Sequence, residues 1–362
     1  MKILTLLLII VLASCSTEQA DYEQNITEEH VIRDTSLFLS HTTHDFVSRP
    51  GGIKAGNEGL YIFDNAHGSV TRVDRQGNPE LSFGQHGEGP GEFESPGGFW
   101  VMEDGYLVYD YGPFEFIKFN RHGEEPEHNV LEENPIHDRF PHQFPLTLDA
   151  VSPEVFLVPS GGREGSLIAV VDVEADTLEF LGEAVDDFVE DYDYEEVNEA
   201  YLTGEIPDIL RNSVMPGNNT SGIFLYQMIT GILEKYDHSG NLLWQKDLRI
   251  PAQQGLFDQI AEANRESADN PEEPPVSYSY AIDMEVREEG VAVLLNTPEG
   301  APLKVAWVPN DGEYFDMVTF EEFNPQHISA GMGDTFTISE QQSEVFFLNP
   351  ETGEIYKAEW PI

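Results

Sequence analysis

The sequence is poor in cysteine and in basic residues. Cys15 is the only cysteine in 362 residues, so the chain cannot form an internal disulfide bond. Lys and Arg number 18 against 67 Asp and Glu, which gives a formal net charge of −49. A surface of this charge repels phosphate backbones and anionic lipid. Nucleic acid is therefore excluded as a partner, and we expect contact with a membrane only through an anchor.

Long apolar segments and familiar catalytic motifs are also missing. The apolar run at residues 3–13 is shorter than the roughly 20 residues that span a bilayer, and no later segment is apolar enough to do so. The sequence has no G-x-S-x-G, no P-loop and no G-x-G-x-x-G between a strand and a helix. The usual signatures of a nucleophilic hydrolase and of a nucleotide site are thus absent.

The first residues have the pattern of a secretion signal. Lys2 followed by the apolar run is typical of a signal peptide, and Leu12-Ala13-Ser14-Cys15 resembles a bacterial lipobox, in which the cysteine receives lipid after cleavage. We expect a signal peptide at 1–14, lipidation of Cys15 and a flexible tether at 15–32. The expected location is the cell envelope, on the periplasmic side of the outer membrane or on the cell surface. An ordinary signal peptide with an incidental cysteine is the alternative.

The acidic residues are spread along the chain, and 40% of all residues are hydrophobic. This composition indicates a folded protein with an acidic surface, not a disordered acidic segment. We favour adaptation to high salt as the reason, because salt screens the repulsion between like charges. A cation-binding surface is the alternative.

A repeat organises the chain. Four short strands are expected at 52–55, 60–63, 69–73 and 80–83, and the next three at 99–102, 106–109 and 114–119. Asp110 follows Asp64 by 46 residues, and Gly123 follows Gly77 by the same interval. The remaining strands are expected at 154–158, 167–172 and 178–181; at 223–226, 232–237 and 242–248; at 281–286, 291–295, 305–308 and 314–319; and at 335–339, 345–348 and 355–360.

Six such units predict an all-β fold, a six-bladed β-propeller of four-stranded antiparallel blades in one domain at 33–362. Each blade would bury both faces against its neighbours, and the strand near Ser36 would complete the last blade and close the ring. A large β-sandwich is the alternative fold, but it does not explain the constant 46-residue interval.

The glycine-rich segment at 84–96, with the pattern GxxGxGPGEFxxP, resembles an NHL-type repeat. More broadly, the chain resembles the six-bladed, TolB-like propeller lipoproteins of Bacteroidota-type bacteria. The resemblance implies a fold and an envelope address. It implies no reaction, because such propellers include binding platforms as well as lyases and lactonases.

Long linkers indicate which face of the propeller carries function. The second and fourth strands of a blade run in the same direction, so the turn after one and the linker after the other share a face. The linkers at 183–213 and 250–277 are long, and we expect short helices there that lie side by side. The candidate binding residues on this face are Asp64, His67, His86, Asp110 and Tyr111. For Asp64 and Asp110 we favour a structural interpretation, in which each carboxylate accepts backbone N–H groups of the following turn.

Metal sites are weakly indicated. Asp191, Asp193, Glu195 and Glu196 could offer oxygens to Ca²⁺, but their spacing does not match an EF-hand, and a solvated acidic helix is favoured. The pairs His41/His44 and His137/His142 lie outside any known hydrolase pattern. We assign no metal site and predict no cofactor, and the sequence leaves only Ca²⁺ or another divalent ion open.

The function expected from these features is a non-enzymatic binding platform, a monomer whose partner is an unidentified protein, peptide or glycan. The alternative is a metal-dependent lyase or lactonase-like hydrolase with its site at the central channel. That alternative requires three or more inward His, Asp or Glu side chains that converge on one metal.

Overall fold

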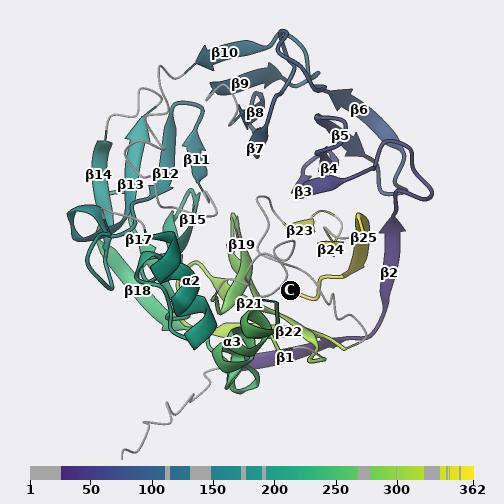
Figure 1. Cartoon of the computed structure of the whole chain (residues 1–362). Helices are drawn as coiled ribbons and strands as arrows, with labels where there is room; N and C mark the ends of the chain where they lie inside the picture. Colours follow the sequence, from purple (N-terminus) through teal and green to yellow (C-terminus); the bar gives the residue numbers. More distant parts are fainter. Residues whose placement is uncertain are drawn as a thin grey trace, which may run out of the picture.

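The computed structural model describes residues 26–110, 115–130, 148–172, 177–189, 193–267, 278–298, 300–321, 335–339, 341, 343–349 and 352–362. Within these residues the strands form six sheets that stand around a common axis (Figure 1). Each sheet is one blade, with its first strand at the axis and its last at the perimeter. The predicted six-bladed propeller is confirmed.

The strands follow the blades in order. The first blade contains β3 (Pro50–Gly56), β4 (Gly59–Asp64), β5 (Ser69–Val73) and β6 (Pro79–Phe83). The second contains β7 (Pro96–Met102), β8 (Gly105–Asp110), β9 (Glu115–Asn120) and β10 (Glu127–Val130). The third contains β11 (Asp149–Ser152), β12 (Val155–Pro159), β13 (Ser166–Asp172) and β14 (Thr177–Glu183).

The fourth blade contains β15 (Val214–Asn219), β16 (Gly222–Gln227), β17 (Ile232–Tyr236) and β18 (Leu242–Asp247). The fifth contains β19 (Ala281–Arg287), β20 (Gly290–Leu295), β21 (Leu303–Pro309) and β22 (Phe315–Phe320). The sixth contains β23 (Phe336–Ser339), β24 (Glu344–Asn349), β25 (Glu354–Glu359) and, from the other end of the chain, β2 (Thr35–Leu39). The antiparallel pairing of β2 with β25 closes the ring as expected.

The N-terminal segment adds a second closure. β1 (Ile26–Ile32) pairs in parallel with β22 on the perimeter of the fifth blade, and β2 follows it onto the sixth. The sequence analysis places residues 26–32 in a flexible tether, whereas the structure has a strand there. The polar residues Glu28 and Glu29 are typical of a flexible tether. Ile26 and Ile32, however, pack against the apolar clusters of the fifth and sixth blades and hold the segment on the propeller.

The core lies between neighbouring blades. Tyr109 and Phe116 of the second blade pack against Phe156 of the third, and the rings of Phe116 and Phe156 stack with centroids 4.1 Å apart. Middle strands such as β8 and β20 are buried along their whole length, because both faces of a blade are covered. This explains why the middle strands read as continuous apolar runs in the sequence.

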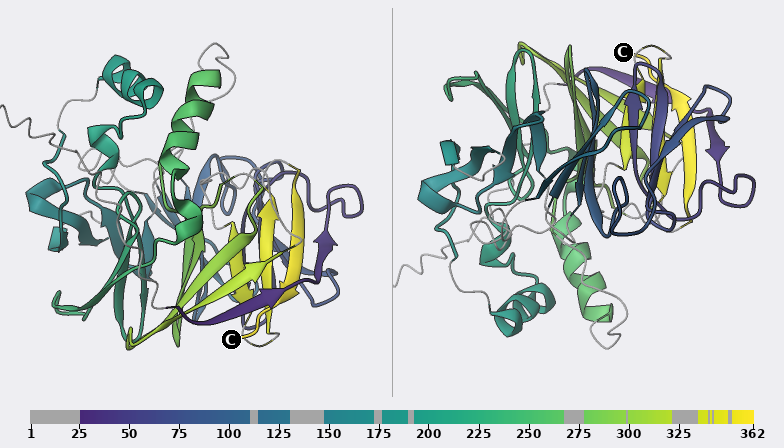
Figure 2. Two further views of the ribbon diagram at one scale, coloured as in Figure 1. Left: turned by 90° about the horizontal axis from the view of Figure 1, so that it is seen from below. Right: turned by 90° about the horizontal axis from the view of Figure 1, so that it is seen from above.

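Two helices project from one face of the ring (Figure 2), here called the helix face. α2 (Tyr194–Thr203) follows the third blade and α3 (Leu256–Ser267) follows the fourth, and they pack together as predicted. Their contact is apolar, and the ring of Tyr201 in α2 also stacks at 5.8 Å on Tyr278, which lies just before β19. The 3₁₀ turns η1 (Arg163–Gly165), η2 (Asp208–Leu210) and η3 (Pro251–Gln253) lie in the connecting segments. Within the described residues, no helix is long and apolar enough to cross a membrane.

Candidate functional site: the axial cavity

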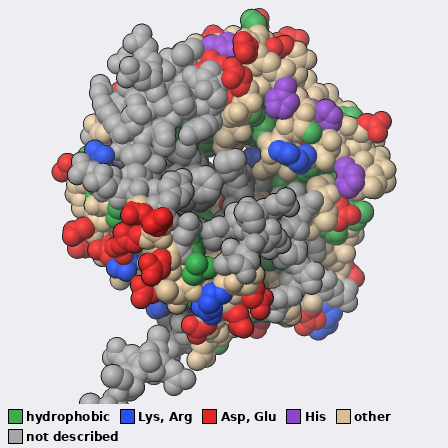
Figure 3. Space-filling model, viewed as in Figure 1, with side chains coloured by type: hydrophobic (Ala, Val, Ile, Leu, Met, Phe, Trp, Pro, Cys, Tyr) green, Lys and Arg blue, Asp and Glu red, His purple; other side chains and the backbone are tan. Residues whose placement is uncertain are grey.

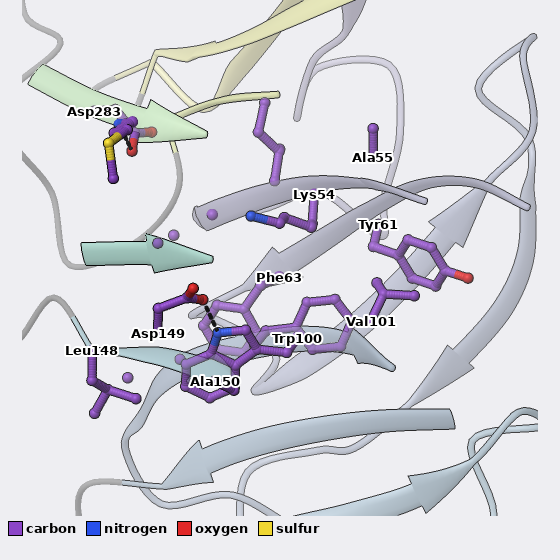
Figure 4. A pocket seen from close by; sticks show the side chains of 18 of the residues that line it. Lys54, Ala55, Tyr61, Phe63, Trp100, Val101, Leu148, Asp149, Ala150 and Asp283 are labelled. Atoms are coloured by element: carbon purple, nitrogen blue, oxygen red, sulfur yellow. Dashed lines mark hydrogen bonds between the residues drawn. The ribbon is translucent and has the colours of Figure 1, made fainter. Parts of the chain in front are cut away.

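A cavity of 540 Å³ lies among the inner strands of the propeller (Figure 4). Its described lining comes mainly from β3, β7, β11, β15 and β19, the first strands of five blades, with additional residues from β4. The lining combines apolar and aromatic side chains with a nearly equal share of polar surface. Its large apolar side chains are Phe63, Phe99, Trp100, Met102, Leu148, Met215, Ile282 and Met284.

Glycine and backbone bulges shape the wall. Pro50-Gly51-Gly52 opens β3, and Pro96-Gly97-Gly98 opens β7 at the same 46-residue interval as the aspartates. The strand register shifts at Gly51, at Gly97 and also at Ile282, and all three residues line the cavity. Bulges of this kind redirect side chains and are over-represented next to binding sites.

The glycine at position 98 is required for a steric reason. A Cβ added to Gly98 would lie 2.5 Å from Cη2 of Trp100, so only glycine lets this ring lie against the wall. Gly217 of β15 is similar, because its Cβ would lie 2.4 Å from Cγ2 of Val286 in the next blade. The sequence analysis offers the central channel only as an alternative site and names none of these lining residues. The repeated Pro-Gly-Gly triplet is the signal that could have found it.

A hydrogen-bonded arc joins the second, third and fourth blades at the cavity. Asp149 at the start of β11 accepts a hydrogen bond from the Trp100 indole of β7 at 3.2 Å and one from the Asn218 amide of β15 at 2.7 Å. The carboxylate therefore holds three inner strands in fixed positions. It also fixes the orientation of the Trp100 ring, which borders the open space in Figure 4.

A second arc joins the fifth, sixth and first blades. Oδ2 of Asp283 in β19 accepts hydrogen bonds from the backbone N–H and hydroxyl of Thr335 and from the N–H of Phe336. Glu285, which is buried, accepts from the Thr337 hydroxyl and from the Ile338 N–H in β23. The Thr337 oxygen in turn accepts from the Ala55 N–H of β3 at 2.8 Å. These bonds make the cavity a preformed feature of the ring.

The end of the cavity on the helix face is bordered by Arg49, Gly51 and Asn65, and we call it the mouth. Asp64 is buried beside this mouth and holds its backbone in place. Its Oδ2 accepts from the N–H groups of Ser48 at 2.5 Å and Arg49 at 2.8 Å, and its Oδ1 accepts from those of Ala66 at 2.9 Å and His67 at 3.0 Å. The carboxylate thus ties the start of β3 to the turn after β4. These are the backbone bonds that the structural interpretation of Asp64 predicts.

The other predicted binding residues support the same region or lie outside the described residues. Nδ1 of His67 lies 3.1 Å from Oδ1 of Asp64, and Nε2 of His86 lies 2.8 Å from the Asn65 carbonyl oxygen. Asp110 repeats the role of Asp64 in the second blade. The structure thus brings Asp64, His67 and His86 together at the mouth, whereas Tyr111 and Cys15 lie outside the described residues.

A smaller cavity of 360 Å³ lies behind the glycine-rich loop and includes Asp110. The groups around it bind each other. Glu115 and His128 are 2.9 Å apart, the Gly91 N–H donates to Nε2 of His128, and the Gly89 N–H donates to Glu92. Because Nε2 accepts a hydrogen bond, Nδ1 carries the proton that is donated to Glu115. Phe93 of the same loop is fully buried, so the glycine-rich motif mainly joins the first two blades.

The candidate metal ligands have other partners. Asp193 caps α2 by accepting from the Glu195 and Glu196 N–H groups, as expected of an acidic helix start. His41 binds the Thr352 carbonyl and His44 binds the Thr43 hydroxyl. Asp191, His137 and His142 lie outside the described residues. In the part of the chain that the structure describes, no group of three or more His, Cys, Asp or Glu is arranged to hold a metal ion.

Comparison with known proteins gives similarity of fold. No protein-family model and no curated protein matches the chain. Among solved structures, a Bacteroides fragilis protein named a "putative exported protein" is 14% identical, with a TM-score of 0.51 over 91% of this chain and 98% of that one. A member of the DUF4221 family from Bacteroides vulgatus is 8% identical, with a TM-score of 0.47 over 91% and 94% of the chains. A streptogramin B lyase is 10% identical, with a TM-score of 0.43 over 90% and 97%. At these identities only the propeller fold is shared.

Proposed function

We propose that this protein is a lipid-anchored propeller of the cell envelope that binds a small amphipathic ligand in its axial cavity without catalysing a reaction. The observation that carries the proposal is the cavity itself. Its 540 Å³ lies within the range of about 300–1,000 Å³ that small-molecule sites occupy, and its lining combines apolar and polar surface in nearly equal parts, as an amphipathic ligand requires. A peptide terminus, a modified sugar or a free small molecule could each supply such a ligand.

The rigidity of the wall supports a binding role. Asp149 and Asp283 use hydrogen bonds to fix inner strands of neighbouring blades, so little ordering is needed when a ligand enters. Trp100 offers a large ring that is already oriented by its bond to Asp149. Aromatic side chains in such settings contribute strongly to binding.

The envelope address rests on the sequence and is supported by the name of the Bacteroides fragilis structure. It is tested at Cys15. Cys15→Ser should abolish metabolic labelling with fatty acid and leave the precursor uncleaved at this position. Unchanged labelling of the variant would refute the anchor without affecting the cavity.

The binding role is tested with the uncharged fluorescent probe N-phenyl-1-naphthylamine. The purified domain should bind this probe at one site, and Trp100→Ala should weaken binding about tenfold, the loss typical of a central aromatic contact. Trp244→Ala is the matched control, because Trp244 is also half-buried and donates its indole N–H, to the Asn310 carbonyl, but lies on the perimeter strand β18. Absence of probe binding, or equal losses in both variants, would refute the axial site.

The lyase or lactonase alternative makes a different prediction. It requires a bound divalent metal, and elemental analysis of the purified protein would find about one equivalent. A non-enzymatic ligand-binding propeller requires none.

A further inference from the structure

We infer that the ligand of the axial cavity carries an anionic group, a carboxylate, and that Arg49 and Asn65 bind this group at the mouth while Lys54 faces it from within the cavity. The inference rests on the proposed function and adds the chemical class of the ligand. It follows from how the hydrogen-bonding capacity of the lining is used.

Donors at the mouth are available. The Arg49 side chain is exposed, and its guanidinium makes no hydrogen bond or ion pair with any described residue. Asn65 is half-buried, and its side-chain amide likewise binds no other described residue. Asn65 lies directly over Gly51, where an added Cβ would be 2.2 Å from Nδ2. The guanidinium presents five N–H donors in a planar fork that matches the two oxygens of a carboxylate.

Both groups are held in place by backbone contacts. Asp64 binds the Arg49 N–H at 2.8 Å, and the Asn65 N–H donates to the Arg49 carbonyl at 2.9 Å. His86 binds the Asn65 carbonyl at 2.8 Å. The backbone of the mouth is thus fixed, and the side chains that project from it need little ordering to bind a ligand.

Acceptors in the lining are largely used. Asp283 accepts three hydrogen bonds on Oδ2 and one on Oδ1, from the Met284 N–H, so most of its accepting capacity is used within the protein. Asp149 accepts from Trp100 and Asn218. Arg287, the third basic residue of the lining, is paired with the buried Glu285. The cavity therefore has donors to offer and few acceptors, which favours a ligand that accepts.

The cavity lining is slightly basic, whereas the chain as a whole is strongly acidic. Its described residues include three basic and two acidic side chains, whereas the whole chain has 18 Lys and Arg against 67 Asp and Glu. Figure 3 shows basic side chains near the axis, and acidic together with further basic side chains farther out on the same face. Interactions between exposed charges are screened beyond about 8 Å at physiological ionic strength. We therefore expect direct contact with the Arg49 guanidinium to outweigh repulsion from the distant acidic surface at that salt concentration.

Two probes with the same aromatic body test the inference. N-phenyl-1-naphthylamine is neutral, and 8-anilinonaphthalene-1-sulfonate adds one anionic group. At 0.15 M salt (physiological strength, about 8 Å of screening length), the wild-type protein should bind the sulfonate roughly tenfold more tightly than the neutral probe. An acidic protein without a local anion site should show the opposite order, because its field repels the sulfonate.

Variants locate the site. Arg49→Gln and Lys54→Gln should each weaken binding of the sulfonate about fivefold to tenfold and leave the neutral probe unchanged. Arg75→Gln and Lys118→Gln are the matched controls, on the turn after β5 and on β9, and should change neither probe. A second arm identifies the anion. 3-Phenylpropanoate should displace the sulfonate probe, and the neutral 3-phenylpropanamide should not.

The outcomes separate this inference from the proposed function. If both probes bind with equal affinity and Arg49→Gln has no effect, the anion subsite is refuted and the apolar cavity stands. If the amide competes as well as the carboxylate, the carboxylate class is refuted. If neither probe binds, the proposed function fails and this inference fails with it.

Discussion

The substitution Asp64→Asn tests the central structural claim, that one buried carboxylate holds the mouth of the cavity. Asp64 is 1% exposed and accepts four backbone N–H groups, two on each oxygen. Asparagine has the same shape but replaces one oxygen with an NH₂ group. In either orientation of the amide, two backbone donors lose their acceptor and face another donor.

The expected cost follows from these contacts. A hydrogen bond to a charged group contributes about 1.5–3 kcal/mol, and a buried donor left unpaired costs a similar amount. Two lost bonds give about 3–6 kcal/mol, and local relaxation with entry of water should leave about 3–4 kcal/mol. Urea unfolding measures this loss as a lower midpoint at an unchanged slope.

Asp74→Asn is the matched control. Asp74 also accepts backbone N–H groups, from Gln76 at 2.8 Å and Asn78 at 2.9 Å, but in an exposed turn on the opposite face. Water can replace these bonds, so we expect a much smaller loss of stability than for Asp64→Asn. Equal destabilisation by the two substitutions would show that Asp64 does not hold the mouth. Asp64→Asn should also weaken binding of the sulfonate probe in the folded state, because Arg49 loses its backbone contact.

Three further predictions concern the rest of the molecule. The melting temperature should rise as NaCl is increased to molar levels, because salt screens the repulsion at −49, and a flat curve would contradict a halophilic surface. The hydrogen bond from Lys304 lowers the pKa of Glu29 on β1 below its usual value, so the carboxylate stabilises the fold at neutral pH, and this contribution is lost as the pH falls through the folded-state pKa. Wild type and Glu29→Gln should therefore differ by under about 1 kcal/mol at pH 7, because the pair is half-exposed, and converge in unfolding titrations below about pH 4. Replacing residues 255–277 with a short Gly-Ser linker should leave a cooperatively unfolding domain, because α3 packs on α2 outside the blade interfaces, and loss of folding would contradict this.

The blades were predictable because middle strands are buried on both faces. Strands such as β8 and β20 are continuous apolar runs bounded by glycine turns, and burial against two neighbours requires that composition. The helix pair was predictable for a related reason. Leu256 and Ile260 form an apolar stripe that must be covered, and α2 covers it. The 3₁₀ turn before α3 is part of the core, unlike the helix pair. Its Gln253 is buried and donates hydrogen bonds to the Tyr280 and Asn296 carbonyls.

The inner strands were harder to predict because they face a cavity. The sequence gives no apolar pattern for β11, with DAVS, or for β15, with VMPGNN. A strand that borders an open space needs no continuous apolar run, and Pro216 and Gly217 weaken the strand pattern further. The contacts that build the site are also distant in sequence. Asp149 binds Trp100 and Asn218, which lie 49 and 69 residues away, and no local pattern reports such a pair.

The two best-matched blades show how a repeat can give rise to a specific site. Asp64 binds the N–H groups of Ser48 and Arg49, and Asp110 binds those of Glu94 and Ser95, which are the residues 46 positions later. These carboxylate–backbone bonds are therefore common to both blades. The side chain that the bonded residue carries differs between them. The first blade places a guanidinium at the cavity where the second has a serine.

The same comparison applies farther along the two inner strands, inside the cavity. Lys54 of β3 and Trp100 of β7 occupy equivalent positions, 46 residues apart, and both line the cavity. One blade thus supplies an ammonium group and the next supplies an aromatic ring at the same depth. Because the backbone is held by bonds that both blades share, substitutions at positions 49, 54 and 100 change what the cavity recognises without changing how it is built. We therefore expect ligand specificity in propellers of this type to reside in such inner-strand positions, with the repeated aspartates as their fixed support.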